Sequence, residues 1–233
     1  MGCAQSQAGA RSERRSRPPR PRVLSAFSYA RIFATLAASM LSVPTRAEVR
    51  TRPLDTARLA LAPLDAQDAR DMWGAVEVSR AHLEPWLPWV PYTFDFDTTH
   101  RYADASSSDW DLGRATRFAI RERTTRRFVG VVGLEAFSHM HQTAELGYWL
   151  RIDAAGRGYM TEAAGQVVSW AFSQLRAHRL RVAASTENHA SLGVIRRLGF
   201  RFEGIAREAE RCHGRWLDHA VFALLATDTR TPR

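Results

Sequence analysis

The chain has 233 residues, of which 45% are hydrophobic and 24% are charged. This length suits one domain with an appendage, and the composition is that of a soluble globular protein and excludes a disordered chain. Its two cysteines, Cys3 and Cys212, exclude a disulfide scaffold and a cysteine-rich zinc site. We therefore expect a protein of a reducing compartment, the cytoplasm.

The formal net charge of +9 is unevenly distributed along the chain. All the basic residues are arginines, and eight of them lie with a single glutamate in residues 1–47, which gives that stretch a charge of +7. Residues 48–233 therefore carry only +2. A nearly neutral domain offers few cations to phosphates, which argues against direct binding of nucleic acid.

Residues 1–47 read as an extension that is disordered or that results from a start assigned too early, with translation beginning near Met40. The stretch is rich in Arg, Ser, Pro and Ala, a composition that also suits an organelle transit peptide. Arg31 interrupts its apolar part, and the uncharged run 32–43 is shorter than the roughly 20 residues that span a bilayer. The first six residues match a myristoylation pattern, but we expect no membrane anchoring.

The rest of the chain predicts strands and helices in the order β-α-α-β-β-β-α-β-α-β-β. Asp65 is placed to cap the first helix. We see no internal repeat or second-domain linker. A mixed sheet with helices on both faces fits this order, so we predict one α/β domain over 48–233. In chain order the elements cover about 58–64, 65–78, 97–112, 117–123, 128–137, 144–151, 158–177, 179–186, 190–198, 200–208 and 216–226.

A glycine-containing loop joins the strand at 144–151 to the helix at 158–177. Gly156 and Gly158 lack the Cβ that would keep a ligand from the backbone, and the first amides of a helix have no intrahelical partner. Free amides, the helix dipole and the cation of Arg157 predict a cradle for a diphosphate. An ordinary tight turn is the alternative. The loop is neither a dinucleotide fingerprint nor a P-loop, because the third glycine and the Gly-Lys-Ser/Thr are absent.

The resemblance to a known superfamily rests on four segments that occur in this order: Gly147–Leu150, Gly156–Ala163, Glu187–Ser191 and Arg197–Phe200, followed by Glu203 and Gly204. Over about 55–227 the chain resembles the GNAT N-acetyltransferases, in particular the ribosomal-protein N-acetyltransferases of the RimJ/RimL type. The segment from Trp86 to Trp89 is also similar to that subgroup. The resemblance implies the GNAT acyl-CoA N-acyltransferase fold, a mostly antiparallel sheet with one splayed parallel strand pair.

The resemblance also implies acetyl-CoA as co-substrate and no metal. Loop amides would bind its diphosphate, and the backbone of the preceding strand would pair with the pantetheine arm and help to polarise the thioester. The family often has Gln or Arg three residues before the first glycine, and Asp153 stands there instead, which weakens the charge support. The residues implied are Ala155, Gly156, Arg157, Gly158 and Tyr159 for the diphosphate, with Leu146, Tyr148, Leu150 and Asn188 for the pantetheine arm.

Transfer of acetyl to an amine needs a neutral amine and a proton for the departing thiolate. Glu145 is the first candidate base, because its strand lies beside the thioester in the family, and Glu135 is the second. The alternative for both is a solvated strand-end charge paired with arginine. Many relatives use a tyrosine as the proton donor, but Ile195 occupies that position, and the resemblance assigns the role to Ser191. Ser191 and Asn188 could instead simply cap a helix.

Three aromatic side chains, Trp86, Trp89 and Tyr92, lie among prolines and predict either an acceptor-binding lip or simple packing. We predict an N-acetyltransferase acting on a primary amine, foremost a protein N-terminal amine, by a monomer or homodimer. The alternatives are a small-molecule amine or antibiotic N-acetyltransferase and a non-catalytic acyl-CoA-binding module. His139 and His141 lack a third metal ligand, and Cys212 has no evident base.

Overall fold

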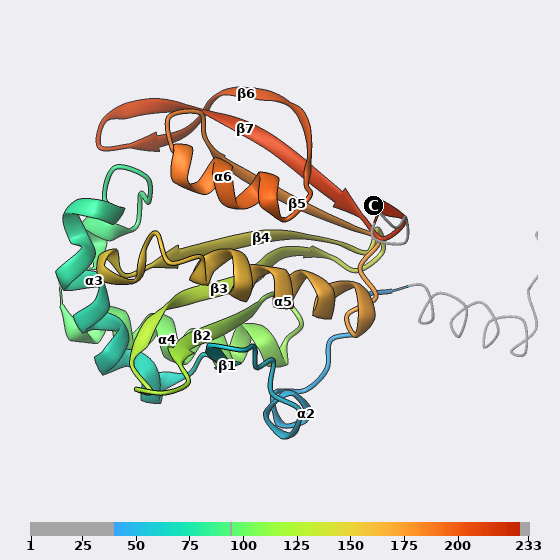
Figure 1. Ribbon diagram of the computed structural model, residues 1–233, viewed down its shortest axis with the longest axis horizontal. Helices are drawn as coiled ribbons and strands as arrows, with labels where there is room; N and C mark the ends of the chain where they lie inside the picture. The colour runs from blue at the N-terminus through green and yellow to red at the C-terminus, as the bar shows by residue number, and fades with distance from the viewer. Residues whose placement is uncertain (1–39, 94, 229–233) are drawn as a thin grey trace, which may run out of the picture. The chain divides into compact units, whose positions relative to one another are not determined.

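A computed structural model of the protein describes residues 40–93 and 95–228 (Figure 1). Its seven-stranded sheet has the spatial order β1-β2-β3-β4-β5-β7-β6, and every neighbouring pair is antiparallel except β4 and β5. The prediction of a mixed, mostly antiparallel sheet is confirmed. The strands are β1 (Leu59–Pro63), β2 (Thr116–Glu122), β3 (Phe128–Ser138), β4 (Thr143–Leu150), β5 (Arg179–Ser185), β6 (Arg201–Cys212) and β7 (Arg215–Leu225).

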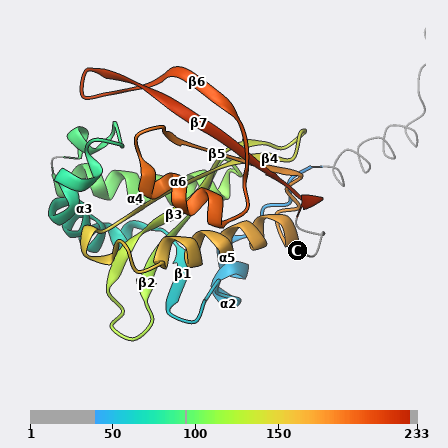
Figure 2. The same ribbon diagram turned by 45° about the horizontal axis from the view of Figure 1, so that its top comes forward.

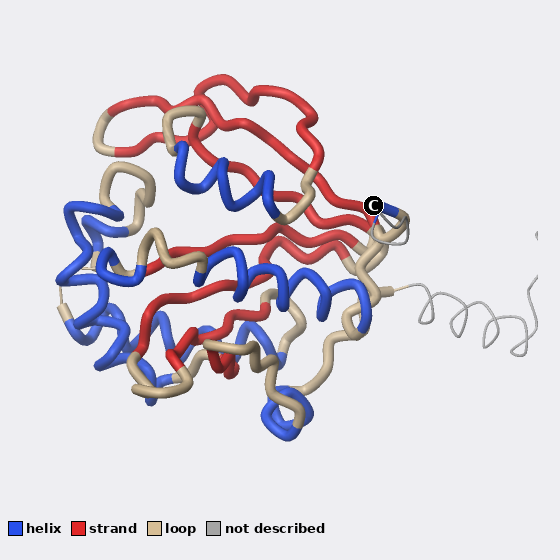
Figure 3. Tube along the Cα trace, in the orientation of Figure 1, coloured by secondary structure: helices blue, strands red, loops and turns tan. Residues whose placement is uncertain are grey.

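Helices lie on both sides of the strand layer, as predicted (Figure 3). Asp65 caps a 3-10 turn rather than the first long helix, which begins four residues later. The helix after the glycine loop ends before residue 177, and Arg176 beyond it adopts a left-handed φ of 58°. In the described part of the chain, no helix is long and apolar enough to cross a bilayer. The helices are α2 (Arg46–Thr51), α3 (Ala69–Leu83), α4 (Phe96–Asp111), α5 (Tyr159–Ser173) and α6 (His189–Arg197), with 3-10 turns at Ala66–Asp68, Val90–Tyr92 and Ile152–Ala154.

The segment before β1 packs against the domain, although the sequence placed its first part in the extension. Leu41 is buried, and the amide of Ser42 donates to the carbonyl of Leu175 at 2.9 Å. Thr45 and Glu48 form a capping box that begins α2, a helix that the sequence analysis did not predict. The packed region thus includes residues ahead of position 48. Our expectations for residues 1–39, including the acylation pattern, lie outside the described residues.

Two apolar clusters fill the two faces of the sheet. The larger joins α5 and α6 to one face, where Trp170 of α5 packs edge-on against Phe118 of β2 with ring centroids 5.4 Å apart. The smaller joins α3 to the other face, where Val131 and Trp149 are buried. In both views α5 and α6 lie in front of the sheet and α4 lies behind it (Figures 1 and 2). Trp149 and Trp170 are therefore core residues.

The parallel strands β4 and β5 pair only where they begin. The last bonded register is Glu145 opposite Arg181. Beyond it β4 continues beside β3 as far as Leu150, and β5 continues beside β7 as far as Ser185. We call the separated parts, 146–150 of β4 and 182–185 of β5, the β4–β5 fork. In Figure 1 the two strands diverge toward the left, where β4 enters the glycine loop. The predicted splayed pair is confirmed.

Candidate active site

The loop after β4 turns twice through the left-handed region. A 3-10 turn over Ile152–Ala154 follows the strand, and Gly156 and Gly158 then adopt φ values of 75° and 77°. Residues with a Cβ are strained in this conformation, so the turn favours glycine. A Cβ built on Gly156 meets nothing within 4 Å. The space beside this loop is therefore open to a ligand.

A continuous run of amides borders that space. Within the described chain, the backbone N–H groups of residues 156–161 have no hydrogen-bond partner, and the first bond of α5 runs from the Glu162 amide to the Gly158 carbonyl at 3.1 Å. Gly158 caps the helix without a side chain. Unpaired amides at a helix start carry partial positive charge and bind anions. The geometry is that expected for a diphosphate cradle.

The cradle is fixed to β1 by an ion pair that the sequence analysis did not identify. The guanidinium of Arg58, just before β1, donates from Nε to Oε2 of Glu162 at 2.7 Å and from Nη1 to the carbonyl of Arg157 at 2.9 Å. The Glu162 carboxylate also accepts from the hydroxyl of Thr56 and the amide of Arg58. Burial works to raise the pKa of Glu162, but these donors hold it below its ordinary value. The carboxylate therefore stays charged at the helix start, where negative charge is favourable.

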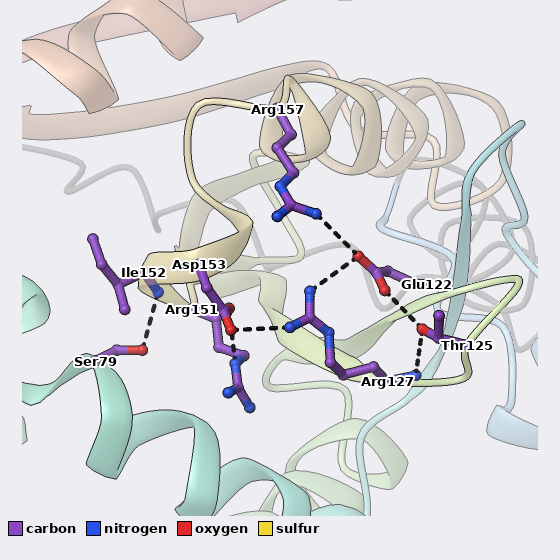
Figure 4. Close-up of polar contacts among 8 residues, drawn as sticks. All are labelled: Ser79, Glu122, Thr125, Arg127, Arg151, Ile152, Asp153 and Arg157. Carbon is purple, nitrogen blue, oxygen red and sulfur yellow. Dashed lines mark hydrogen bonds and ion pairs between the residues drawn. The ribbon is translucent and has the colours of Figure 1, made fainter.

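A cluster of charged side chains lies beside the cradle (Figure 4). Arg157, the cation predicted to assist the diphosphate, is half exposed and stands 3.8 Å from Oε1 of Glu122. Asp153 accepts from Arg127 and from Arg151, each at 2.9 Å. The acid that departs from the family pattern is thus held by two arginines.

Three of the predicted site residues meet across the fork. The hydroxyl of Tyr148, on β4, lies 2.9 Å from Oγ of Ser191 and 3.3 Å from its carbonyl oxygen. The side-chain oxygen of Asn188 accepts from the Ser191 amide at 3.0 Å and caps α6. Burial raises the pKa of Tyr148 to about 12, so its hydroxyl remains protonated. The Tyr148 side chain was not predicted to contact Ser191, because nothing in sequence spacing relates the two positions.

The two candidate bases lie side by side at the narrow end of the fork. Glu135 of β3 is directly opposite Glu145 of β4, and both project to the face covered by α3. Each has an arginine partner: Glu145 binds Arg181 of β5, and Glu135 accepts from Nε of Arg117 at 2.8 Å. Tyr148 projects to the other face, toward α6. The bases and Ser191 therefore approach the fork from opposite sides.

The three aromatic side chains of the predicted acceptor-binding lip differ in burial. Trp89 packs against Trp149, with ring centroids 6.1 Å apart, and Trp86 is half-buried, whereas Tyr92 is 71% exposed. The β6–β7 hairpin reaches the same loop, since the Cys212 thiol donates to the Glu84 carbonyl at 3.3 Å. Cys212 is buried, which raises the pKa of its thiol, so it is a structural residue. The described residues contain no group of three potential metal ligands.

Comparison with known proteins places the chain among acetyltransferases. A protein named "Probable N-acetyltransferase YjcK" from Bacillus subtilis (strain 168) is 38% identical over 112 residues, which are 48% of this chain and 62% of that relative. The protein "Uncharacterized N-acetyltransferase p20" of Bacillus licheniformis is 29% identical over 177 residues, or 74% and 95% of the two chains. The [ribosomal protein uS5]-alanine N-acetyltransferase of Escherichia coli (strain K12) is 25% identical over 194 residues, or 78% and 95%.

Solved structures share the fold. The ribosomal L7/L12 α-N-protein acetyltransferase RimL, in complex with coenzyme A, superimposes with a TM-score of 0.72 at 22% identity and covers 76% of this chain and 99% of its own. Mycobacterium smegmatis RimJ, in complex with CoA-disulfide, gives a TM-score of 0.68 at 26% identity, with 74% and 84% covered. The sequence family described as "Acetyltransferase (GNAT) domain" matches residues 58–201, more than half of the chain. The chain therefore belongs to the GNAT acetyltransferase family.

Proposed function

We propose that this enzyme transfers the acetyl group of acetyl-CoA to a primary amine, in particular the N-terminal α-amino group of a cytoplasmic protein. The observation that carries the proposal is the unbroken run of unpaired amides, 156–161, at the open end of the β4–β5 fork. A diphosphate at these amides directs an attached pantetheine arm along the fork. Acetyl-CoA, when bound, supplies an acetyl thioester that is activated toward an amine.

The free edge of β4 fits the pantetheine arm. Within the described residues, the backbone of 146–150 is bonded to β3 on one side only, since β5 has moved away. Unpaired backbone groups near the interior need a partner, and the arm carries amides that can supply one. We assign Leu146, Tyr148 and Leu150 to this contact. The side-chain nitrogen of Asn188 is left for the arm, because its oxygen is used in the helix cap.

Gly156→Ala tests the cradle. The new Cβ is strained by the left-handed φ, at a cost of about 1 kcal/mol, and occupies the space assigned to the diphosphate. Gly214→Ala is the matched control, because Gly214 has a φ of 76° and equally open surroundings at the β6–β7 turn. We expect both variants to lower the melting temperature of the free protein similarly, and only Gly156→Ala to lose the stabilisation by added CoA. Equal stabilisation of the two variants would remove the cradle from the proposal.

We assign the role of base to Glu145. Glu145 lies on β4 at the last paired position before the fork, and its partner Arg181 lies on β5, the other strand of the fork. Its side chain is 37% exposed, so a water molecule can connect it to an amine. Glu135 is one strand farther from the fork, and Arg117, which binds it, is also bound to Asp109. Glu135 therefore supports the charge arrangement on this face.

Glu145→Gln should lower kcat by at least about tenfold at pH 7, whereas Glu135→Gln should leave kcat within roughly threefold of the unaltered enzyme. The two changes remove the same charge from directly paired positions, so each serves as the control for the other. The measurement is steady-state release of CoA thiol at saturating acetyl-CoA. A larger loss in Glu135→Gln would exchange the two assignments.

The departing thiolate needs a proton, which we assign to the hydroxyl of Ser191. When Tyr148 donates its hydrogen to Ser191, the hydrogen of Ser191 is free to point into the fork. That hydrogen passes from Oγ to the sulfur, and the hydrogen of Tyr148 replaces it on Oγ. The attacking amine releases one proton to solvent by way of Glu145. Tyr148 later regains one proton from solvent, so the number of protons is conserved. Tyr148 is thus a positioning residue for Ser191, and it also supplies the proton that Ser191 Oγ regains.

Double-variant kinetics test this pair. Ser191→Ala should lower kcat by about tenfold or more with less than a twofold change in CoA affinity, and Tyr148→Phe should lower kcat by less. Because Tyr148 acts through Ser191, adding Tyr148→Phe to Ser191→Ala should cause little further loss. Ser169→Ala, whose hydroxyl bonds within α5, is the control. Independent, multiplying losses would show that the two hydroxyl groups do not form a relay.

Two features support a protein N-terminus as the acceptor. Relatives over most of the chain include an enzyme named as an N-acetyltransferase for an alanine of ribosomal protein uS5, and the neighbouring structure RimL is named as an α-N-protein acetyltransferase. An α-amino group with a pKa of about 7.8 is roughly 15% neutral at pH 7, against about 0.04% for lysine, so a partly solvated base is adequate for it. We assign the extended peptide to the exposed Tyr92 and to the β6–β7 hairpin, which contacts the start of the same loop at Glu84.

The function itself is tested by measuring thiol release from acetyl-CoA with short peptides. We expect turnover with peptides that have a free N-terminus, at a rate at least tenfold above that of the same peptides carrying a blocked N-terminus and an internal lysine. Spermidine and aminoglycosides serve as small-amine comparisons. Faster turnover of a small amine would change the acceptor class, and CoA binding without turnover of any amine would indicate a silent binding module.

A further inference from the structure

Two carboxylates lie beside the cradle that is proposed to hold a diphosphate, where negative charge is unfavourable for that ligand. Glu122 ends β2, and its side chain is 9% exposed. Asp153 lies in the 3-10 turn that leads to Gly156. Burial works against ionisation of Asp153, but Arg151 and Arg127 hold its pKa below the ordinary value; hydrogen bonds from Thr125 and Arg127 do the same for the pKa of Glu122. Both groups are therefore anionic at neutral pH and would repel a bound diphosphate.

One arginine binds both of these carboxylates. Arg127 directly precedes β3 in the β2–β3 hairpin. Its guanidinium donates hydrogen bonds to Oε1 of Glu122 at 3.1 Å and to Oδ2 of Asp153 at 2.9 Å (Figure 4). Oε1 of Glu122 is also the atom that Arg157 approaches to 3.8 Å, beyond hydrogen-bond distance. Arg127 and Arg157 therefore compete for one oxygen, and Arg127 has the shorter contact.

We infer that Arg127 is a positioning residue for coenzyme binding, because it neutralises Glu122 and Asp153 and so leaves Arg157 free to turn to the diphosphate. This inference rests on the proposed function, since it needs an acetyl-CoA site at the cradle. Without Arg127, the nearly buried Glu122 would lack its closest cation and would bind Arg157, because a buried carboxylate requires a partner. The cradle would then lose a cation and face an uncompensated Asp153.

The bonds of Arg127 could alternatively serve only to attach the β2–β3 hairpin to the glycine loop. The net charge of the cluster distinguishes this structural role from charge compensation. The cluster in Figure 4 contains the cations Arg127, Arg151 and Arg157 against the anions Glu122 and Asp153, an excess of one positive charge. Removing Arg127 abolishes that excess, and removing the charge of Asp153 as well restores it. A purely structural attachment would not be recovered by the second change, because the amide introduced by Asp153→Asn would have no arginine at position 127 to bind.

The experiment measures CoA binding by isothermal titration calorimetry with Arg127→Gln, Asp153→Asn and the double variant. We expect Arg127→Gln to weaken CoA binding roughly five- to tenfold at low ionic strength and less at 0.5 M salt. The double variant should bind CoA at least about twofold more tightly than Arg127→Gln, because Asp153 is then neutral although Glu122 still binds Arg157. Arg126→Gln is the matched control. Arg126 is adjacent, carries the same charge and forms no ion pair within the described residues, so its loss should change CoA affinity by less than twofold.

A second readout separates the diphosphate from the rest of the coenzyme. Acetyl-pantetheine lacks the diphosphate, so Arg127→Gln should lower kcat/KM for acetyl-CoA and leave kcat/KM for acetyl-pantetheine unchanged. Equal CoA affinity in Arg127→Gln and the unaltered protein, or failure of Asp153→Asn to restore binding, overturns the inference. Should Arg127→Gln unfold, Arg127→Lys, which keeps the charge, should bind CoA within about threefold of the unaltered protein, and a larger loss also overturns it. Absence of CoA binding to the unaltered protein would instead refute the proposed function.

Discussion

The separation of β4 from β5 is the constraint on which the rest of the site depends. A strand in the middle of a sheet normally satisfies its backbone groups on both edges, but β4 is paired on both edges only as far as Glu145. Beyond that register one edge is left for a ligand, and the strand leads directly to the left-handed turns at Gly156 and Gly158. A single departure from regular pairing thus leaves a long unpaired edge, and the unpaired amides of the proposed anion cradle lie at its end.

Charge around this edge is arranged in pairs that keep their members in place. Glu162 is bound by Arg58, which joins the first turn of α5 to the start of β1. Glu145 and Glu135 would repel each other as directly opposed carboxylates, and each is bound by an arginine on its outer side. The enzyme can therefore carry several ionised acids close to the site of an anionic co-substrate, because arginines from neighbouring strands and loops compensate them.

The sequence predicted what depends on local pattern, and it failed where distant segments meet. The order of strands and helices and the glycine turn were predicted from alternation, caps and glycine, which are local signals, and the splayed pair from the family resemblance. The contact of Tyr148 with Ser191 and the bonds of Arg127 to Asp153 join residues from different elements, and no spacing encodes them. The prediction that Asp153 weakens the charge support of the loop is not tested by the structure, and the sequence could not show that Arg127 reaches this acid from another hairpin. Helix α2 was missed because a six-residue helix gives almost no periodicity.

The helix cap and the proposed proton donor do not compete for Ser191. Asn188 accepts from the backbone N–H of Ser191, which leaves the Ser191 hydroxyl outside the cap. Capping fixes the first turn of α6, so the hydroxyl is held at a set position relative to β4, where Tyr148 meets it. A serine alone is a weak acid, and a buried tyrosine whose pKa is about 12 is a considerably stronger one. In the proposed mechanism the cap therefore serves the chemistry, because it holds the hydroxyl of Ser191 beside Tyr148, a better proton source.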